Sequence, residues 1–166
     1  MDTNLLILLI AALTIIGGTA AYIMYIKIKN EGGTSGESSS AMQLQAYERL
    51  ILLTDRIALP NLISRVNVPG ISAKEMQHLL THNIKEEFAH NITQQMYVSA
   101  DAWTAVKNLK EQNMLIVNQV GNVLPPNATS LDLNKMLLEY LMTDKKGSLH
   151  EVVSEVLSYE AKKVMQ

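Results

Sequence analysis

Carboxylates and histidines at metal-ligand spacing lie in one stretch of the sequence, residues 75–90. Glu75 and His78, and again Glu87 and His90, are three residues apart, which is the spacing of the ligands in di-iron helical bundles. A di-iron centre takes its pairs from different helices, whereas both pairs here fall on one predicted helix, and Glu75 is needed to cap that helix. We therefore expect no metal site here.

A second metal-binding pattern in the same helix is a histidine pair four residues apart. His78 and His82 match His-x-x-x-His, which can hold a metal ion when a third ligand and a pocket are present. A projection at 100° per residue places both on the face opposite to the apolar side chains. We interpret them as solvated surface residues.

Other polar residues of this helix fall within its apolar face. They are Glu87, His90, Asn91 and Gln94. A buried carboxylate without a partner costs several kcal/mol or takes up a proton, so Glu87 should meet a partner. The next predicted helix carries Lys110 and Asn113 within its own apolar face.

An antiparallel hairpin of the two helices, turning near residues 98–99, would pair positions whose numbers sum to about 197. Glu87 then meets Lys110, and Asn83 approaches Asn113. We favour the interpretation that this polar seam is structural and fixes the register of the two helices. In the alternative, these residues line an incompletely closed groove or contact a partner chain.

The elements that position these residues are all expected to be helices, about five to six in number, over residues 41–166. Apolar residues recur at spacings of three and four, and no run alternates as a half-buried strand does. Pro60 should break the first helix near Leu59 and start a short one. Further starts are predicted at a capping box of Ser72 and Glu75 with a helix to about Met96, at Ser99, at Thr129 or Ser130, and at a second capping box of Ser148 and Glu151.

Composition excludes several classes of protein. With 166 residues, a formal charge of −2 and no cysteine, the chain lacks the basic surface of a nucleic-acid binder, disulfides and thiolate metal sites. It also has no phosphate-binding loop, dinucleotide fingerprint or nucleophile elbow. We therefore predict that the protein is not an enzyme and uses no cofactor and no small-molecule substrate.

The N-terminal segment has the character of a membrane anchor. Residues 5–26 contain no charge, and a helix of that length covers roughly 33 Å, enough for a hydrocarbon core of about 30 Å. Lys27 and Lys29 follow it, which predicts a cytoplasmic C-terminal side and an external N-terminus. We therefore divide the chain into an anchor with its flanks (1–29), a flexible Gly/Ser linker (30–40) and a helical domain (41–166).

Two longer stretches carry a resemblance to a known family. Residues 44–62, which include Leu44-Gln45-Ala46-Tyr47-Glu48-Arg49-Leu50, and residues 87–99, which begin Glu87-Phe88-Ala89-His90-Asn91, together with Trp103, resemble a family of uncharacterised bacterial proteins. The resemblance implies one N-terminal membrane helix, a small helical domain and the bacterial plasma membrane. It implies no activity.

These observations together lead to an expectation of function. We expect a single-pass membrane protein whose helical domain acts as an interaction or scaffold module, with a protein partner or a second copy of itself. The alternative is a sensor that binds a small molecule or metal in a pocket walled by Glu87, His90 and Asn91.

Overall fold

The computed structural model of the chain describes residues 21–27, 38–143 and 149–166. The chain divides into two compact units, Met1–Ala41 and Met42–Gln166. In the first unit, residues 21–27 are helical and exposed. Most of the predicted anchor (residues 5–20) and of the predicted linker (residues 30–37) lies outside the described residues. The last residues assigned to the linker, 38–40, are helical.

No helix among the described residues combines the length and the apolar character needed to cross a bilayer.

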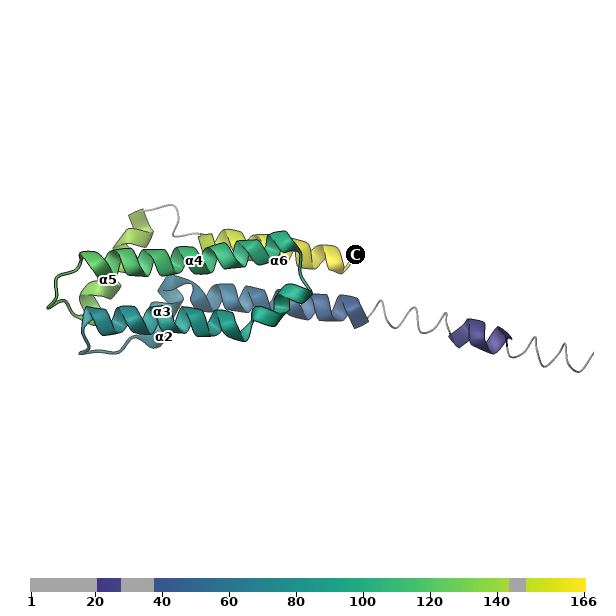
Figure 1. Cartoon of the computed structure of the whole chain (residues 1–166). Coiled ribbons are helices and arrows are strands. Elements are labelled where there is room, and N and C mark those ends of the chain that lie inside the picture. Colours follow the sequence, from purple (N-terminus) through teal and green to yellow (C-terminus); the bar gives the residue numbers. More distant parts are fainter. Residues whose placement is uncertain (1–20, 28–37, 144–148) are drawn as a thin grey trace, which may run out of the picture. The chain divides into compact units, whose positions relative to one another are not determined.

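The second unit is built from helices alone in its described part, which confirms the all-α prediction. Figure 1 shows their order: the first helix over residues 38–57, which enters this unit at residue 42, α2 (Leu59–Val66), α3 (Ala73–His90), the 3-10 helix η1 (Ile92–Met96), α4 (Ala100–Val123), α5 (Ser130–Thr143) and α6 (Leu149–Val164).

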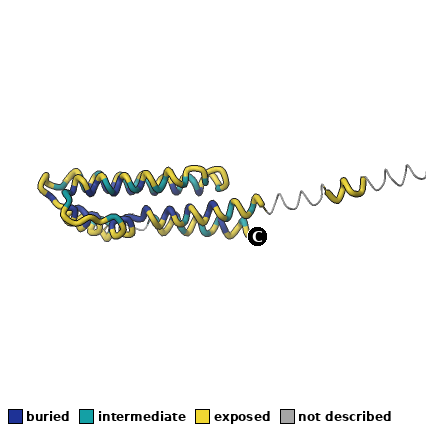
Figure 2. Tube along the Cα trace, turned by 90° about the horizontal axis from the view of Figure 1, so that it is seen from below, coloured by how far each residue is buried: buried dark blue, intermediate teal, exposed yellow. Residues whose placement is uncertain are grey.

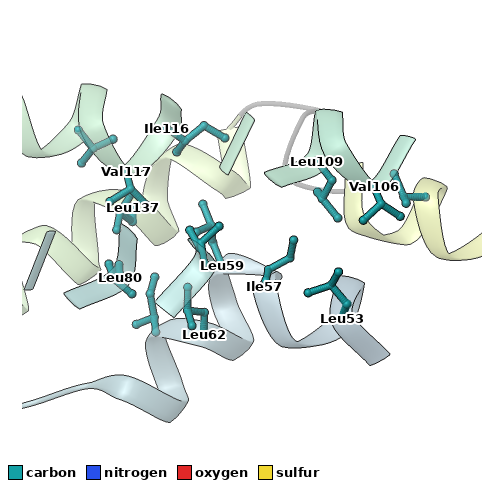
Figure 3. Packing of buried hydrophobic residues seen from close by; sticks show 14 of the residues in the cluster. Leu53, Ile57, Leu59, Leu62, Leu80, Val106, Leu109, Ile116, Val117 and Leu137 are labelled. Atoms are coloured by element: carbon teal, nitrogen blue, oxygen red, sulfur yellow. The ribbon is translucent and has the colours of Figure 1, made fainter. Parts of the chain in front are cut away.

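The helices of the second unit enclose one apolar core. α3 and α4 pack together, α5 contacts both, α6 packs on α4, and α2 contacts α3 and α5. Figure 2 shows the buried residues along the inner side of each helix. In the close view of Figure 3, Ile57 and Leu59 point toward α4 and its residue Ile116. All three side chains are at most 2% exposed, so this contact ties the first helices to the centre of the bundle.

Helix starts follow the predicted caps. Ser72 and Glu75 form the capping box of α3, with the Ser72 N–H donating to the Glu75 carboxylate at 2.9 Å. The Ser99 hydroxyl accepts from the Ala102 N–H at 3.0 Å at the start of α4. Thr129 caps α5 and exchanges hydrogen bonds with Asp132. Ser148, the cap predicted for α6, lies outside the described residues.

The predicted end of α3 is wrong. The helix ends at His90 rather than near Met96, and η1 follows it. The cause is Asn91, whose side-chain amide donates to the Glu87 carbonyl at 2.9 Å and whose N–H donates to the Phe88 carbonyl. These bonds close the last turn locally, as asparagine side chains do when they compete with the helical ladder.

α3 and α4 approach closely at Gly121. A Cβ placed on Gly121 would lie 2.6 Å from Cδ of Gln77. The buried Gln77 side chain therefore fits only because residue 121 has no side chain. Its amide Nε2 donates to the side-chain oxygen Oδ1 of Asn118 at 3.0 Å. Glycine lowers the stability of a helix by about 1 kcal/mol relative to alanine, but here it allows α3 and α4 to approach closely.

Candidate functional site

The chain breaks its helix at Ala58, as the sequence predicts. The first helix ends at Ile57, Ala58 has an extended ψ of 121°, and α2 begins at Leu59 with Pro60 in its first turn. A helix end leaves its last four carbonyls without helical N–H partners. Pro60 adds to this deficit because it has no N–H to offer to the Arg56 carbonyl.

Two of the four carbonyls are satisfied close to the break. The Ala58 N–H lies 3.1 Å from the Thr54 carbonyl oxygen and 3.2 Å from that of Asp55. The side-chain amide of Asn61 also donates to the Asp55 carbonyl at 3.2 Å and to the Asp55 carboxylate at 2.8 Å. The carbonyls of Thr54 and Asp55 are therefore satisfied by residues that lie close to them in sequence.

The other two carbonyls need side chains from more distant positions. Arg65 of α2 donates from Nη2 to the Arg56 carbonyl at 3.2 Å. Asn113 of α4 donates from Nδ2 to the Ile57 carbonyl at 2.7 Å, and its side chain is buried. Asn113 thus serves the backbone at a position where no main-chain donor reaches.

Glu87 of α3 is held by both arginines. Arg56 forms a two-pronged pair with it, Nε to one carboxylate oxygen at 2.8 Å and Nη2 to the other at 2.6 Å. Nη2 of Arg65 lies 3.3 Å from the same carboxylate. We call Arg56, Ile57, Arg65, Glu87 and Asn113 the helix-break cluster.

The electrostatics of the helix-break cluster keep Glu87 ionised. The hydrogen bonds from Arg56 lower the pKa of the Glu87 carboxyl, against partial burial that raises it, and the charge of Arg65 lowers it further. The same bonds raise the pKa of Arg56. The Glu87 side chain is 15% exposed and that of Arg56 is 50% exposed, so this is a half-sheltered ion pair.

The predicted partner of Glu87 is wrong, although the predicted register of the hairpin is confirmed. Nζ of Lys110 lies 5.3 Å from the centre of the Phe88 ring. The numbers of these two residues sum to 198, close to the sum of about 197 that the predicted register requires. Lys110 forms its ion pair with Glu111 at 2.7 Å. Asn83 does not pair with Asn113 either, since its side-chain amide donates to the Leu79 carbonyl of its own helix.

The reason for the error lies in the rotation of 100° between successive helical residues. Phe88 occupies the side of α3 that faces α4, where its ring lies 5.2 Å from that of Trp103. Glu87 is turned by one residue toward the first helix and α2. A prediction that considers only the α3–α4 hairpin leaves out the first helix and α2, which supply the two arginines that pair with Glu87.

The remaining predicted site residues do not join the helix-break cluster. His90 is exposed, Asn91 caps the end of α3, and Gln94 of η1 makes a long hydrogen bond to Thr93 at 3.4 Å. Glu87, His90 and Asn91 are therefore neighbours in sequence, but the carboxylate of Glu87 and the amide of Asn91 are both engaged with the protein itself.

A family profile matches residues 3–164 of the chain. The chain belongs to the DUF7935 family, a family of unknown function. No curated protein and no solved structure is significantly similar to it. The family membership confirms the resemblance noted in the sequence, and it assigns no chemistry to the DUF7935 residues described here.

A second polar cluster in this DUF7935 chain was not predicted from the sequence. The Tyr47 hydroxyl donates to the Glu160 carboxylate at 2.7 Å and accepts from the Ser99 N–H at 3.2 Å. The Ser99 hydroxyl donates to the same carboxylate at 2.5 Å. Burial and the neighbouring Glu160 carboxylate raise the pKa of Tyr47. We call these three residues the Tyr47 cluster.

The residues of the Tyr47 cluster come from three elements that are far apart in sequence. Tyr47 lies on the first helix, Ser99 caps α4 and Glu160 lies near the end of α6. No local pattern announces such a contact. The cap at Ser99 was the only part that the sequence could indicate.

His78 and His82 of α3 lie on the surface, as predicted. Both are exposed, and their rings stack with centres 6.3 Å apart. Across the described residues, no group of three or more histidine, aspartate or glutamate side chains is arranged to hold a metal ion.

A hollow of about 580 Å³ lies between the first helix and α6, away from the predicted polar residues. Thr54 and Asp55 line one wall, and the other is formed by one side of α6, including Ser154, Ser158 and Lys162. The hollow is open to the surface between the two helices.

Proposed function

We propose that the protein is a single-pass membrane protein of the bacterial plasma membrane whose helical domain is a cytoplasmic interaction or scaffold module. The charge-free segment Leu5–Ile26 supports the anchor, since its length and composition suit a bilayer. Lys27 and Lys29 on its C-terminal side support the orientation.

The observation that carries the interaction role is an apolar row on the outer surface of α5. Leu131, Leu138 and Met142 are seven and four residues apart, which places them on one side of the helix. Leu131 is 73% exposed, and the other two are exposed as well. Apolar side chains exposed on one side of a helix suit contact with a protein partner, and Lys135 separates Leu131 from Leu138 and Met142 in this row.

The inward polar residues support a structural rather than a chemical role. The Glu87 carboxylate is engaged by two arginines and the Asn113 amide by the Ile57 carbonyl. A ligand would have to displace these bonds. The alternative sensor function, built on Glu87, His90 and Asn91, therefore has no observation in its favour.

The experiment is a capture from detergent-solubilised membranes of the native organism, followed by mass spectrometry. The full chain is compared with a Leu131→Asp, Leu138→Asp variant and with a Lys135→Asp control, which reverses the charge of Lys135 in the same row and keeps Leu131 and Leu138. We expect a stoichiometric partner, or a second copy of the chain, that the apolar variant loses and the control keeps. Equal recovery with all three chains would contradict the role of the row.

A further inference from the structure

Three distant segments of the domain meet at one end of the helical bundle. The Tyr47 cluster joins the middle of the first helix, the segment between η1 and α4, and the last turns of α6. Figure 1 shows η1 and the C-terminus at the same end, and the opposite end is formed by the connection from α4 to α5. We call the first the η1 end.

The η1 end exposes large apolar side chains. Met96 is 73% exposed and Met165 is 66% exposed. Met42, Ile92 and Tyr97 are exposed to a smaller extent. α3 ends at His90 instead of continuing to about Met96, and the η1 residues Ile92 and Met96 lie exposed on the surface.

The chemistry of the η1 end suits the surface of a bilayer. Methionine and isoleucine favour the acyl region, and a tyrosine places its ring in the apolar zone and its hydroxyl in the headgroup zone. Lys162 and Lys163, in the last turn of α6, are exposed near Met165. Cations beside apolar residues favour contact with anionic headgroups.

The covalent attachment of the N-terminal segment to the helical domain indicates which surface covers the η1 end. Residues 1–41 are attached at Met42, five residues before Tyr47, whose hydroxyl accepts from the Ser99 N–H at this end. The proposed anchor ends at residue 26, and the 15 residues from 27 to 41 can separate it from Met42 by no more than roughly 50 Å even when fully extended. A lipid surface is therefore the surface that the anchor holds at high local concentration next to the η1 end.

We propose that the η1 end docks on the lipid surface, with Ile92, Met96 and Tyr97 entering the headgroup region, so that the bundle stands on the membrane with its α4–α5 connection away from it. This inference rests on the proposed function, because it needs the anchor. It adds an orientation, and it leaves the apolar row of α5 to a partner protein.

The absence of cysteine allows a clean test on the full chain. Met96→Cys and Leu131→Cys each introduce one labelling site at the same exposure, 73%, at opposite ends of the bundle. Each variant carries an environment-sensitive fluorophore and is reconstituted into vesicles of phosphatidylethanolamine and phosphatidylglycerol. Lipids that carry a nitroxide on the upper acyl chain serve as the quencher, and flotation of the vesicles reports whether the chain is anchored.

We expect lipid quenching to be several-fold stronger at position 96 than at position 131. Adding Ile92→Asp to the Met96→Cys chain should remove most of this difference, whereas Leu138→Asp should leave it unchanged. Quenching that is equal at the two positions, or absent from both while the chain floats with the vesicles, would overturn the docking and leave the anchor intact.

Two other outcomes also separate the proposals. A chain that does not float with the vesicles would overturn the anchor, and with it the docking. Cross-linking of position 96 between two copies without lipid quenching would show that a second copy covers the η1 end, which would overturn the lipid contact alone.

Discussion

The helix-break cluster and the Tyr47 cluster both join distant elements by polar side chains, but they do so with different chemistry. In the helix-break cluster, a carboxylate of lowered pKa is paired with two arginines, and an amide completes the backbone beside Pro60. In the Tyr47 cluster, a hydroxyl of raised pKa shares a carboxylate with a serine.

The difference shows two reasons why a polar residue can lie on the apolar face of a helix. The helix-break cluster repairs a local defect, because a proline and a helix end leave carbonyls that must be satisfied. The Tyr47 cluster compensates for no local backbone defect, and it fixes the first helix relative to the start of α4 and the last turns of α6. The first should therefore respond most to loss of a backbone partner, and the second to loss of a hydroxyl.

The largest effect is expected for Asn113→Ala. The Ile57 carbonyl would lose the side-chain donor that reaches it at 2.7 Å, and a buried unsatisfied carbonyl costs about 1–3 kcal/mol. We expect a loss of about 2–3 kcal/mol in the free energy of unfolding, measured by denaturant titration of the full chain in detergent. Asn108→Ala, at an exposed position of the same helix, is the control and should change little. An equal loss in both variants would contradict the role of the Asn113–Ile57 hydrogen bond, because alanine by itself favours the helix over asparagine.

A smaller effect is expected for Tyr47→Phe, which keeps the buried ring and removes the hydroxyl. The Ser99 N–H loses its acceptor and Glu160 loses one donor, so we expect a loss of about 1–2 kcal/mol. The exposed Tyr159→Phe should be neutral. Because the pKa of Tyr47 is raised in the fold, its contribution is complete below the ordinary pKa of about 10 and is lost as the pH rises through the folded value. This loss of unfolding free energy at alkaline pH should occur in the wild-type chain and be absent from Tyr47→Phe.

Glu87→Gln tests the charged half of the comparison. The variant keeps one acceptor but loses the two-pronged charge pair with Arg56, for an expected cost of about 1 kcal/mol at neutral pH, limited by solvent around the half-exposed arginine.

The acid side of the pH profile distinguishes Glu87→Gln from Tyr47→Phe. The lowered pKa of Glu87 means that its contribution is present above its ordinary pKa and is lost as the pH falls through the folded value. The difference in unfolding free energy between wild type and Glu87→Gln should therefore shrink below about pH 4.5. A difference that is constant from neutral to acid pH would show that the ion pair adds nothing.

The smallest effect is expected for Gly121→Ala, at a contact that belongs to neither cluster. The new Cβ would collide with Gln77, while the helix gains about 1 kcal/mol in propensity. We expect a net change below about 1 kcal/mol, and a stabilising sign when Gln77→Ala is combined with it. Thermal unfolding of the two single variants and the double variant measures this coupling. Strictly additive values would contradict the close approach.

Much of the fold could be predicted from the sequence, because its signals are local. The break at Pro60, the capping box of Ser72 and Glu75, and the cap at Ser99 are each written in a few adjacent residues. The end of α3 was missed because the Asn91 side chain competes with the helical ladder.

The candidate site was less predictable because its partners are not local. The sequence showed that Glu87 and Asn113 lie on apolar faces, and both are indeed engaged inside the fold. Their partners at residues 56, 57 and 65 depend on a third helix that packs against the hairpin. Only the carbonyls left by Pro60 could have pointed to the region, and no pattern pointed to Tyr47 and Glu160.

The account depends on the attachment of the chain to a lipid bilayer through residues 5–26, and extraction of membranes from cells that express the full chain tests it directly. We predict that the protein stays in the membrane pellet through alkaline carbonate and high salt, and that it is released only by detergent. Recovery of the intact chain in the soluble fraction without detergent would contradict the account.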